Sequence, residues 1–383
     1  MPLFILAHLS HHLVTALPPP LLPYIRDEFA LDYTRAGLII SAFGVVYGVC
    51  QLPAGWLADR AGSRTLLTVG IVGVAGTGLL AAASQNYWML IASMVLMGVL
   101  GGGYHPAATA MLSAAVAARQ RGRALGFHMV GGSASYFLAP LIAAGLAAIG
   151  GWRVPFIALG LPAMALGVML HIIVKRRIPD RKVKVDSTVN LTEAPHISDR
   201  MPRLVTLITL STLTQAVLMS IVSFVPLYLV DNFGTANELA AASISLVYFM
   251  GLWAGPVGGH LSDRFGRMVI VVIMCSLGSL AIYLLSAVPY GMGIAVLLVL
   301  IGIAIYFNTT AAQAYIVDQV SERRRSTVLG IYFFGNMEGA GVLTPVLGYL
   351  IDHFGFQFSF TSAGVFLAAI LMIATTILWL KRT

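Results

Sequence analysis

Five histidines in apolar stretches of this sequence are candidates for proton chemistry: His8, His11 and His12 near its start, then His105 and His128. The first three are spaced i, i+3 and i+4, so a helix would place them on one face. Imidazole gains and loses protons near neutral pH, so these side chains can carry a proton or, when charged, bind an anion. The structural alternative is that each histidine only makes a hydrogen bond that stabilises the fold.

Histidine is also a common zinc ligand. No carboxylate or cysteine accompanies the five histidines at ligand spacing. The sequence therefore predicts no metal site and no cofactor, and it favours proton handling.

Glu338 differs from the other acidic residues of the chain. It lies in the middle of the apolar stretch GIYFFGNMEGAGVLTP, whereas the others lie in polar loops or near the ends of apolar stretches. An acidic side chain inside a membrane is costly and marks a functional site by default. Glu338 is therefore the first candidate for proton coupling. The structural alternative is a neutral glutamic acid that is hydrogen-bonded between helices.

The elements that must position these residues are membrane-spanning helices. Of the 383 residues, 58% are hydrophobic and 10% are charged, whereas soluble domains carry about 25% charged residues. Apolar runs of about 20 residues are long enough to cross a bilayer as helices, and lipid favours helices because they satisfy their own backbone hydrogen bonds. We predict an all-α membrane protein with twelve spans: 2–25, 35–58, 64–84, 87–117, 122–149, 153–174, 203–230, 238–262, 267–288, 291–318, 326–350 and 357–380.

The two halves of the sequence resemble each other. GWLADRAGSR at 55–64 is matched by GHLSDRFGR at 259–267, and RALGFHMVGG at 123–132 by TVLGIYFFGN at 327–336, with the same offset of 204 residues. Parallel repeats of this kind are typical of transporters built from two similar halves. We expect an N-terminal six-helix bundle at 1–174, a cytoplasmic linker at 175–202 and a C-terminal six-helix bundle at 203–383, around a central cavity.

The basic residues are distributed unevenly along these spans. Of the 23 Lys and Arg residues, only Arg26, Arg35 and Arg153 would lie on the outer side if the N-terminus is cytoplasmic. The positive-inside rule then predicts a multi-pass protein of the cell membrane with both termini in the cytoplasm. The net charge of +8 reflects this topology and gives some affinity for the anionic lipids of the bilayer. We therefore expect no binding of nucleic acid. Because no charged segment precedes the first apolar stretch, we expect it to be a retained helix and not a signal peptide.

The repeated loops combine glycines with charged residues. Glycine allows a tight turn and close helix approach, and the charged side chains can pair with adjoining helices. We interpret the loops as a cytoplasmic gate that stabilises one of two conformations; the alternative is turn chemistry and topology alone. The gate residues are Gly55, Asp59, Arg60, Gly62, Arg64, Gly259, Asp263, Arg264, Gly266 and Arg267.

These motifs resemble the major facilitator superfamily. The first loop is similar to its G-x-L-A-D-R-x-G-R-K signature, with Ser63 in place of the first closing basic residue. Met94 stands where many drug–proton antiporters of the family carry an arginine. GGGYHPAATA at 101–110 and the histidines of the first span look more like the fosmidomycin-resistance type of drug exporter. The resemblance implies twelve helices in two pseudo-symmetric bundles, alternating access and a monomer.

In the fold that this resemblance implies, the first, fourth, seventh and tenth spans line the cavity. Asn308 and Thr309 occupy the repeat positions of Tyr104 and His105. These side chains could instead only join neighbouring helices. The cavity candidates are His8, Tyr47, Gln51, Tyr104, Gln215, Tyr248, Trp253, Phe307, Asn308, Thr309 and Gln313.

The function that the sequence favours is secondary transport. The chain has no ATP-binding G-x-x-x-x-G-K-[ST] motif, so an ion gradient or a substrate gradient must supply the energy, and the titratable groups favour protons. We expect proton-coupled export of small organic compounds, drug-like or anionic. The alternative is a proton-coupled importer of a small organic anion or metabolite. A receptor or chaperone would need a sizeable soluble domain, and a membrane enzyme would need a nucleophile–base set; the sequence shows neither.

Overall fold

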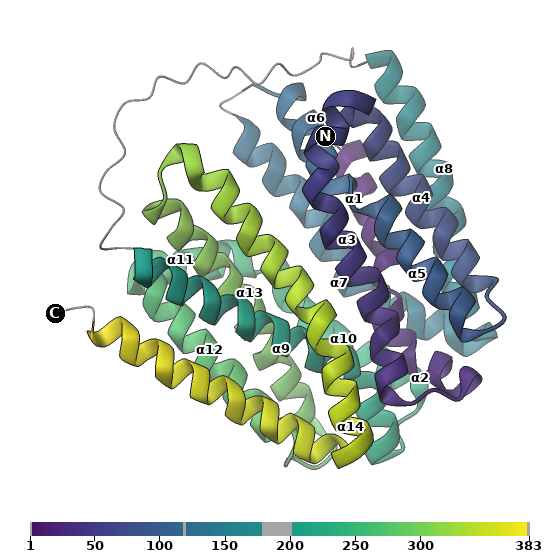
Figure 1. Ribbon diagram of the computed structural model, residues 1–383. Helices are drawn as coiled ribbons and strands as arrows, with labels where there is room; N and C mark the ends of the chain where they lie inside the picture. Colours follow the sequence, from purple (N-terminus) through teal and green to yellow (C-terminus); the bar gives the residue numbers. More distant parts are fainter. Residues whose placement is uncertain (1, 118–119, 178–200, 381–383) are drawn as a thin grey trace.

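The computed structural model describes residues 2–117, 120–177 and 201–380, and the elements in these ranges are helices (Figure 1). We call residues 2–177 the first half and residues 201–380 the second half. The first half contains α1 (Pro2–Thr15), α2 (Pro18–Phe29), α3 (Tyr33–Ala61), α4 (Ser63–Ala82), α5 (Tyr87–Gly101), α6 (Tyr104–Ala115), α7 (Arg121–Gly150) and α8 (Arg153–Arg177). The second half contains α9 (Met201–Phe233), α10 (Asn237–Phe249), the 3-10 helix η2 (Met250–Leu252), the π-helix η3 (Ala254–Gly258), α11 (Gly259–Phe265), α12 (Arg267–Leu285), α13 (Met292–Gln319) and α14 (Glu322–Leu380).

The described residues contain fewer helices of membrane-crossing length than the twelve predicted spans. Within the described ranges, nine helices are long and apolar enough to cross a membrane, or ten if the bent pair Asn237–Leu252 and Ala254–Phe265 is counted as one span. There are two reasons for the difference from twelve. The first predicted span is divided into α1 and α2, with 14 and 12 residues. The last two predicted spans both lie within α14, which bends at Gly355.

Local residue types explain these breaks. Pro18 begins α2 at a position where the missing amide hydrogen costs nothing. Gly355 has a φ of 76°, which a helix does not tolerate and glycine adopts readily. The two helices of the bent pair meet at an angle of 50° between Leu252 and Ala254, directly before η3. π-Helical turns such as η3 are frequent at functional sites.

The two repeated loops form the same turn. Gly62 (φ 85°, ψ 136°) lies between α3 and α4, and Gly266 (φ 96°, ψ 136°) lies between α11 and α12. Each amide donates to the carbonyl four residues earlier, of Ala58 or Ser262. A side chain is strained at such a positive φ, so the turn requires glycine. The expected turn chemistry of the repeat is therefore confirmed.

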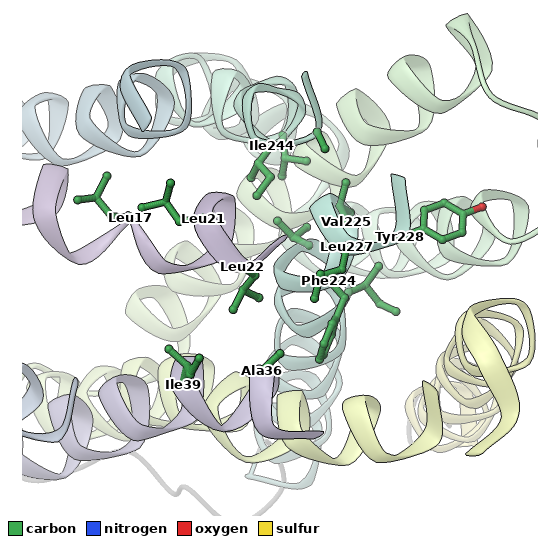
Figure 2. Packing of buried hydrophobic residues seen from close by; sticks show 14 of the residues in the cluster. Leu17, Leu21, Leu22, Ala36, Ile39, Phe224, Val225, Leu227, Tyr228 and Ile244 are labelled. Carbon is green, nitrogen blue, oxygen red and sulfur yellow. The ribbon is translucent and has the colours of Figure 1, made fainter. Parts of the chain in front are cut away.

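The two halves meet mainly where α3 packs on α14, α7 on α10 and α2 on α9, and α2 also contacts α10. In Figure 1 the ribbons of the halves meet near α2 and the bend of α14, and diverge toward the N and C ends. Figure 2 shows the shared core, with Leu22 of α2, Ala36 of α3 and Phe224 of α9 close together. Because lipid tails are as apolar as these side chains, close packing holds such helices together.

Glycine permits one of the closest helix approaches. A Cβ atom at Gly302 of α13 would overlap the backbone carbonyl oxygen of Val247 in α10. We expect Gly302→Ala to cost about 1–3 kcal/mol through overpacking and to lower the midpoint of thermal unfolding in detergent. The control is Gly145→Ala, because nothing lies within 4 Å of a Cβ atom there. Equal midpoints for the two variants would contradict this packing.

Candidate functional site

The five histidines come together in the first half. His8, His11 and His12 lie on α1, His105 on α6 and His128 on α7. The His8 ring stacks on the His128 ring at a centroid distance of 4.1 Å and lies 4.8 Å from His12 and 5.2 Å from His105. All are buried except His105, which is half-buried. We call these five residues the histidine cluster.

Backbone carbonyls orient three of the rings. Nδ1 of His8, His11 and His128 lies 2.8, 3.0 and 2.9 Å from the carbonyl oxygens of His128, Gly70 and Phe4. A carbonyl oxygen only accepts, so each Nδ1 must donate. In the neutral ring, Nε2 then carries the lone pair and is the basic nitrogen.

The other two histidines face each other. Nε2 of His12 lies 3.3 Å from Nε2 of His105, and Nδ1 of His12 lies 3.1 Å from Oγ1 of Thr15. Two imidazole nitrogens at this distance repel unless one of them carries a hydrogen or a cation lies between them. The arrangement therefore suits a site that holds a proton or another positive species.

Close helix packing leaves the His8 ring little freedom. A Cβ atom at Gly132 of α7 would lie 2.6 Å from Cε1 of His8, so glycine at this position makes room for the ring. On the other side of the cluster, Tyr104 stacks on His11 at 4.2 Å. These contacts hold α1 against its neighbours and fix the direction of the imidazole rings.

Aromatic rings connect the histidine cluster to the second half. His12 lies 5.0 Å from Tyr136 of α7, and Tyr136 lies 5.4 Å from Tyr248 of α10. Nε2 of His11 lies 3.2 Å from the Tyr47 hydroxyl. The cluster thus reaches the helices where the halves meet, so a change of its charge can act on their packing.

A second polar cluster lies at the corresponding place in the second half. Ser211 Oγ lies 2.9 Å from the Tyr332 hydroxyl, and Asn308 Nδ2 donates to the Ser211 carbonyl at 3.3 Å. Thr309 Oγ1 donates to Gln215 Oε1 at 3.4 Å. We call these five residues the second-half counterpart.

The residues of the counterpart correspond to first-half residues that lie 203 or 204 positions earlier in the sequence, and two of their contacts join corresponding pairs. The pair Gln215–Thr309 repeats His12–His105, and Ser211–Tyr332 repeats His8–His128. None of the five counterpart residues is histidine or acidic, so the proton-binding groups of the two clusters lie in the first half. The corresponding residues are Ser211 for His8, Gln215 for His12, Asn308 for Tyr104, Thr309 for His105 and Tyr332 for His128.

The remaining cavity candidates are dispersed. Tyr248 and Phe307 are buried, and Gln51 and Gln313 are half-buried. Trp253 is 52% exposed, and its ring contacts Phe249. The side chain of Glu338 lies outside the described residues, so its role stays a prediction.

Three arginines of the repeated loops contact residues of their own half. Arg60 lies over the Trp56 ring at 4.0 Å, and Arg264 over the Phe265 ring at 5.4 Å. Arg267 pairs with Asp263 and, at 3.1 Å, with Asp318 at the end of α13. The surroundings of Gly55 and the side chain of Asp59 lie outside what the structure describes. A gate that joins the halves through these loops stays a prediction.

At the other end of the helices, polar side chains do join the halves. Arg26 of α2 donates to both carboxylate oxygens of Asp231 in α9, at 2.6 and 2.8 Å, and the Tyr33 hydroxyl donates to the same carboxylate at 2.7 Å. Asp352 of α14 accepts from the backbone amides of Tyr33 and Thr34 at the start of α3. We call this set the α2-end contacts. Sequence analysis did not identify them, although Arg26 was one of three basic residues on the predicted outer side.

A second ion pair at this end lies within the first half. Arg153 and the Trp152 indole donate to the Glu28 carboxylate. Hydrogen bonding to Arg153 lowers the pKa of Glu28 below its ordinary value, because these bonds stabilise the charged form. The pair anchors the end of α2, which also carries Arg26.

Comparisons with known proteins agree with this architecture. The chain is 28% identical over 368 residues to the multidrug resistance protein MdtG of Salmonella paratyphi C, covering 92% of this chain and 89% of that protein. It is 23% identical over 368 residues to the hexuronate transporter of Bacillus subtilis, covering 91% and 85%. One relative is thus named for multidrug resistance and the other for hexuronate transport.

Among solved structures, a bacterial homolog of the human lysosomal transporter Spinster in an inward-facing conformation matches with a TM-score of 0.79 and 16% identity, over 99% of this chain and 95% of that one. A model of the Major Facilitator Superfamily matches residues 4–335 and 210–383. The chain is thus a multi-pass membrane transporter and not an enzyme. It belongs to the Major Facilitator Superfamily.

Proposed function

We propose that this protein is a secondary active transporter that exports small organic compounds, drug-like or anionic, in exchange for protons. One observation carries the proposal: the buried histidine cluster reaches the contact between the halves through Tyr136 and Tyr248. The second-half counterpart has no histidine or acid. The name of the MdtG relative, a multidrug resistance protein, supports drug-like compounds as the substrates.

Alternating access gives the cluster its role. A transporter with two conformations moves toward the one that its bound ligand favours. A proton on an imidazole changes the charge beside the contact between halves and so favours one conformation. The positive charge also attracts an anionic substrate.

A second candidate is proton-coupled import of a small organic anion. The second-half counterpart favours it, because hydroxyl and amide groups such as Ser211, Asn308 and Thr309 suit a hydroxyl-rich solute. The hexuronate transporter relative is named for a substrate of that kind. The two candidates differ in whether protons and substrate move in opposite or equal directions.

The topology in this proposal is that of the sequence prediction. Twelve crossings form two six-helix bundles, at 1–174 and 203–383, in the inner membrane of a bacterium, and both termini face the cytoplasm. Residues 178–200 of the linker lie outside the described residues. The protein acts as a monomer, its partners are the substrate, protons and lipid, and Glu338 is a further proton-coupling group.

The test uses the purified protein in liposomes that contain a pH dye and a metal chelator. A panel of drugs and organic anions is applied to wild type, to Glu338→Gln and to empty liposomes. Proton movement opposite to substrate supports export by exchange, and movement in the same direction supports the importer. Substrate flux without proton movement would remove the coupling. Coupling that is lost in Glu338→Gln would assign that residue to it.

A further inference from the structure

We propose that His8, His12 and His105 together bind one divalent transition-metal ion of the zinc, nickel or cobalt class. Each residue presents a ring nitrogen, and the three nitrogens lie within 4.8 Å of one another. The three ring centroids are 4.8, 5.2 and 5.2 Å apart, so the rings surround a common point. This proposal revises the sequence prediction that no metal is bound.

The closest pair of nitrogens already has the spacing of two zinc ligands. Zinc–nitrogen bonds of about 2.0–2.1 Å at a tetrahedral angle place the two nitrogens about 3.3–3.4 Å apart. Nε2 of His12 and Nε2 of His105 are 3.3 Å apart. A cation between them would take the place of the hydrogen that this contact otherwise needs, and it would bond to both nitrogens. The His8 nitrogen lies within 4.8 Å of these two, so His8 has to shift, together with its contacts on α7, to complete the set.

The outer hydrogen bonds are those that metal-binding histidines need. A ligating histidine donates its other ring N–H to a carbonyl, hydroxyl or carboxylate, which fixes the tautomer and the direction of the ring. His8 donates from Nδ1 to the His128 carbonyl. Nδ1 of His12 lies beside the Thr15 hydroxyl. His8 thus keeps Nε2 for a ligand, and His12 does so in the tautomer that donates from Nδ1 to the Thr15 hydroxyl.

The positions of the three histidines on their helices also favour a common site. His8 and His12 are four residues apart on α1, so they share a face, and His105 approaches from α6. Because Gly132 has no side chain, the His8 ring can lie close to α7. A site on packed helices loses little freedom when the ion binds, because the rings are already directed.

Three neutral imidazoles leave the ion with its full charge and with an open fourth position. Zinc sites with three protein ligands add water or another small ligand there. A double positive charge inside a membrane is costly, so an anion at the fourth position would strengthen binding. Imidazole ligands suit zinc, nickel and copper better than magnesium or calcium.

The test is metal binding by the full chain in detergent, purified without a polyhistidine tag and stripped with a chelator. Cobalt is added as a coloured probe, and zinc is then used to displace it. We expect one cobalt per chain, with the visible absorption of a tetrahedral site. His12→Gln and His105→Thr introduce the residues of the second-half counterpart, and each should weaken zinc binding by about tenfold or more. His353→Gln, at an exposed histidine of α14, is the control and should bind as wild type does.

Two results would overturn the proposal: no cobalt absorption in wild type, or zinc binding that is equal in wild type and both cluster variants. If the variants fail to elute as folded monodisperse protein, X-ray absorption of the wild-type zinc complex decides, since it must show three imidazole nitrogens. The binding assay measures no transport, and the liposome assay contains chelator. Failure of one proposal is therefore distinguishable from failure of the other.

Discussion

Replacing His12 by glutamine and His105 by threonine is expected to weaken proton coupling strongly without unfolding the protein. The same residue pair, Gln215–Thr309, forms a hydrogen bond at the corresponding place in the second half. The fold therefore accommodates these side chains in this position. Neither side chain binds a proton near neutral pH, whereas imidazole does.

The expected size of this effect is large. Losing a positioned proton-transfer group lowers a rate by about 10²–10⁴-fold, and we expect proton movement per substrate to fall by about tenfold or more. The liposome assay with the pH dye measures it, with His353→Gln as the matched control. Wild-type proton movement in the double variant would exclude these two histidines from coupling. It would leave Glu338, His11 and His128 as the remaining candidates.

Asp231→Asn is expected to shift the protein away from the conformation described here. Asp231 accepts two hydrogen bonds from Arg26 and one from Tyr33, and together these join α9 to α2 and α3. The side chains of Arg26 and Asp231 are 17% and 22% exposed, so solvent screens the pair only in part. Hydrogen bonds to a charged group contribute about 1.5–3 kcal/mol. This corresponds to a change of roughly ten- to hundredfold in the equilibrium between conformations.

Distances between spin labels can measure this shift. Labels at Arg60 of α3 and Phe265 of α11 report on the other end of the helices, where both side chains are exposed. The free cysteines Cys50 and Cys275 are first replaced by alanine. In alternating access, separation of the halves at the α2 end brings them together at the other end. Asp231→Asn is therefore expected to shorten the distance between the labels at Arg60 and Phe265.

Two variants control this experiment. Asp27→Asn removes a carboxylate that pairs with Arg26 within α2, so it should leave the label distances unchanged. The exchange of Arg26 by Asp and Asp231 by Arg should restore the wild-type distribution. A distribution in Asp231→Asn that is identical to wild type would show that the α2-end contacts do not hold this conformation.

The sequence alone determined the helices, the turns and the family. Apolar stretches predict membrane helices because lipid leaves the backbone no other hydrogen-bond partners. The repeated loops predicted the glycine turns, and Gly62 and Gly266 adopt equal conformations. The i, i+3, i+4 spacing brought His8, His11 and His12 together, since three residues on one helix need no tertiary contact to share a face.

Only the tertiary structure decided how distant residues meet. The stacking of His128 on His8, the 3.3 Å approach of His105 to His12 and the pairing of Arg26 with Asp231 join different helices. In a soluble helix the polar face shows which side is buried. In a membrane helix both faces are apolar, because lipid and core attract the same side chains. The rotation of each helix, and with it the set of nitrogens that can share a proton or a metal ion, is therefore set by packing between helices, such as the fit of the His8 ring against Gly132.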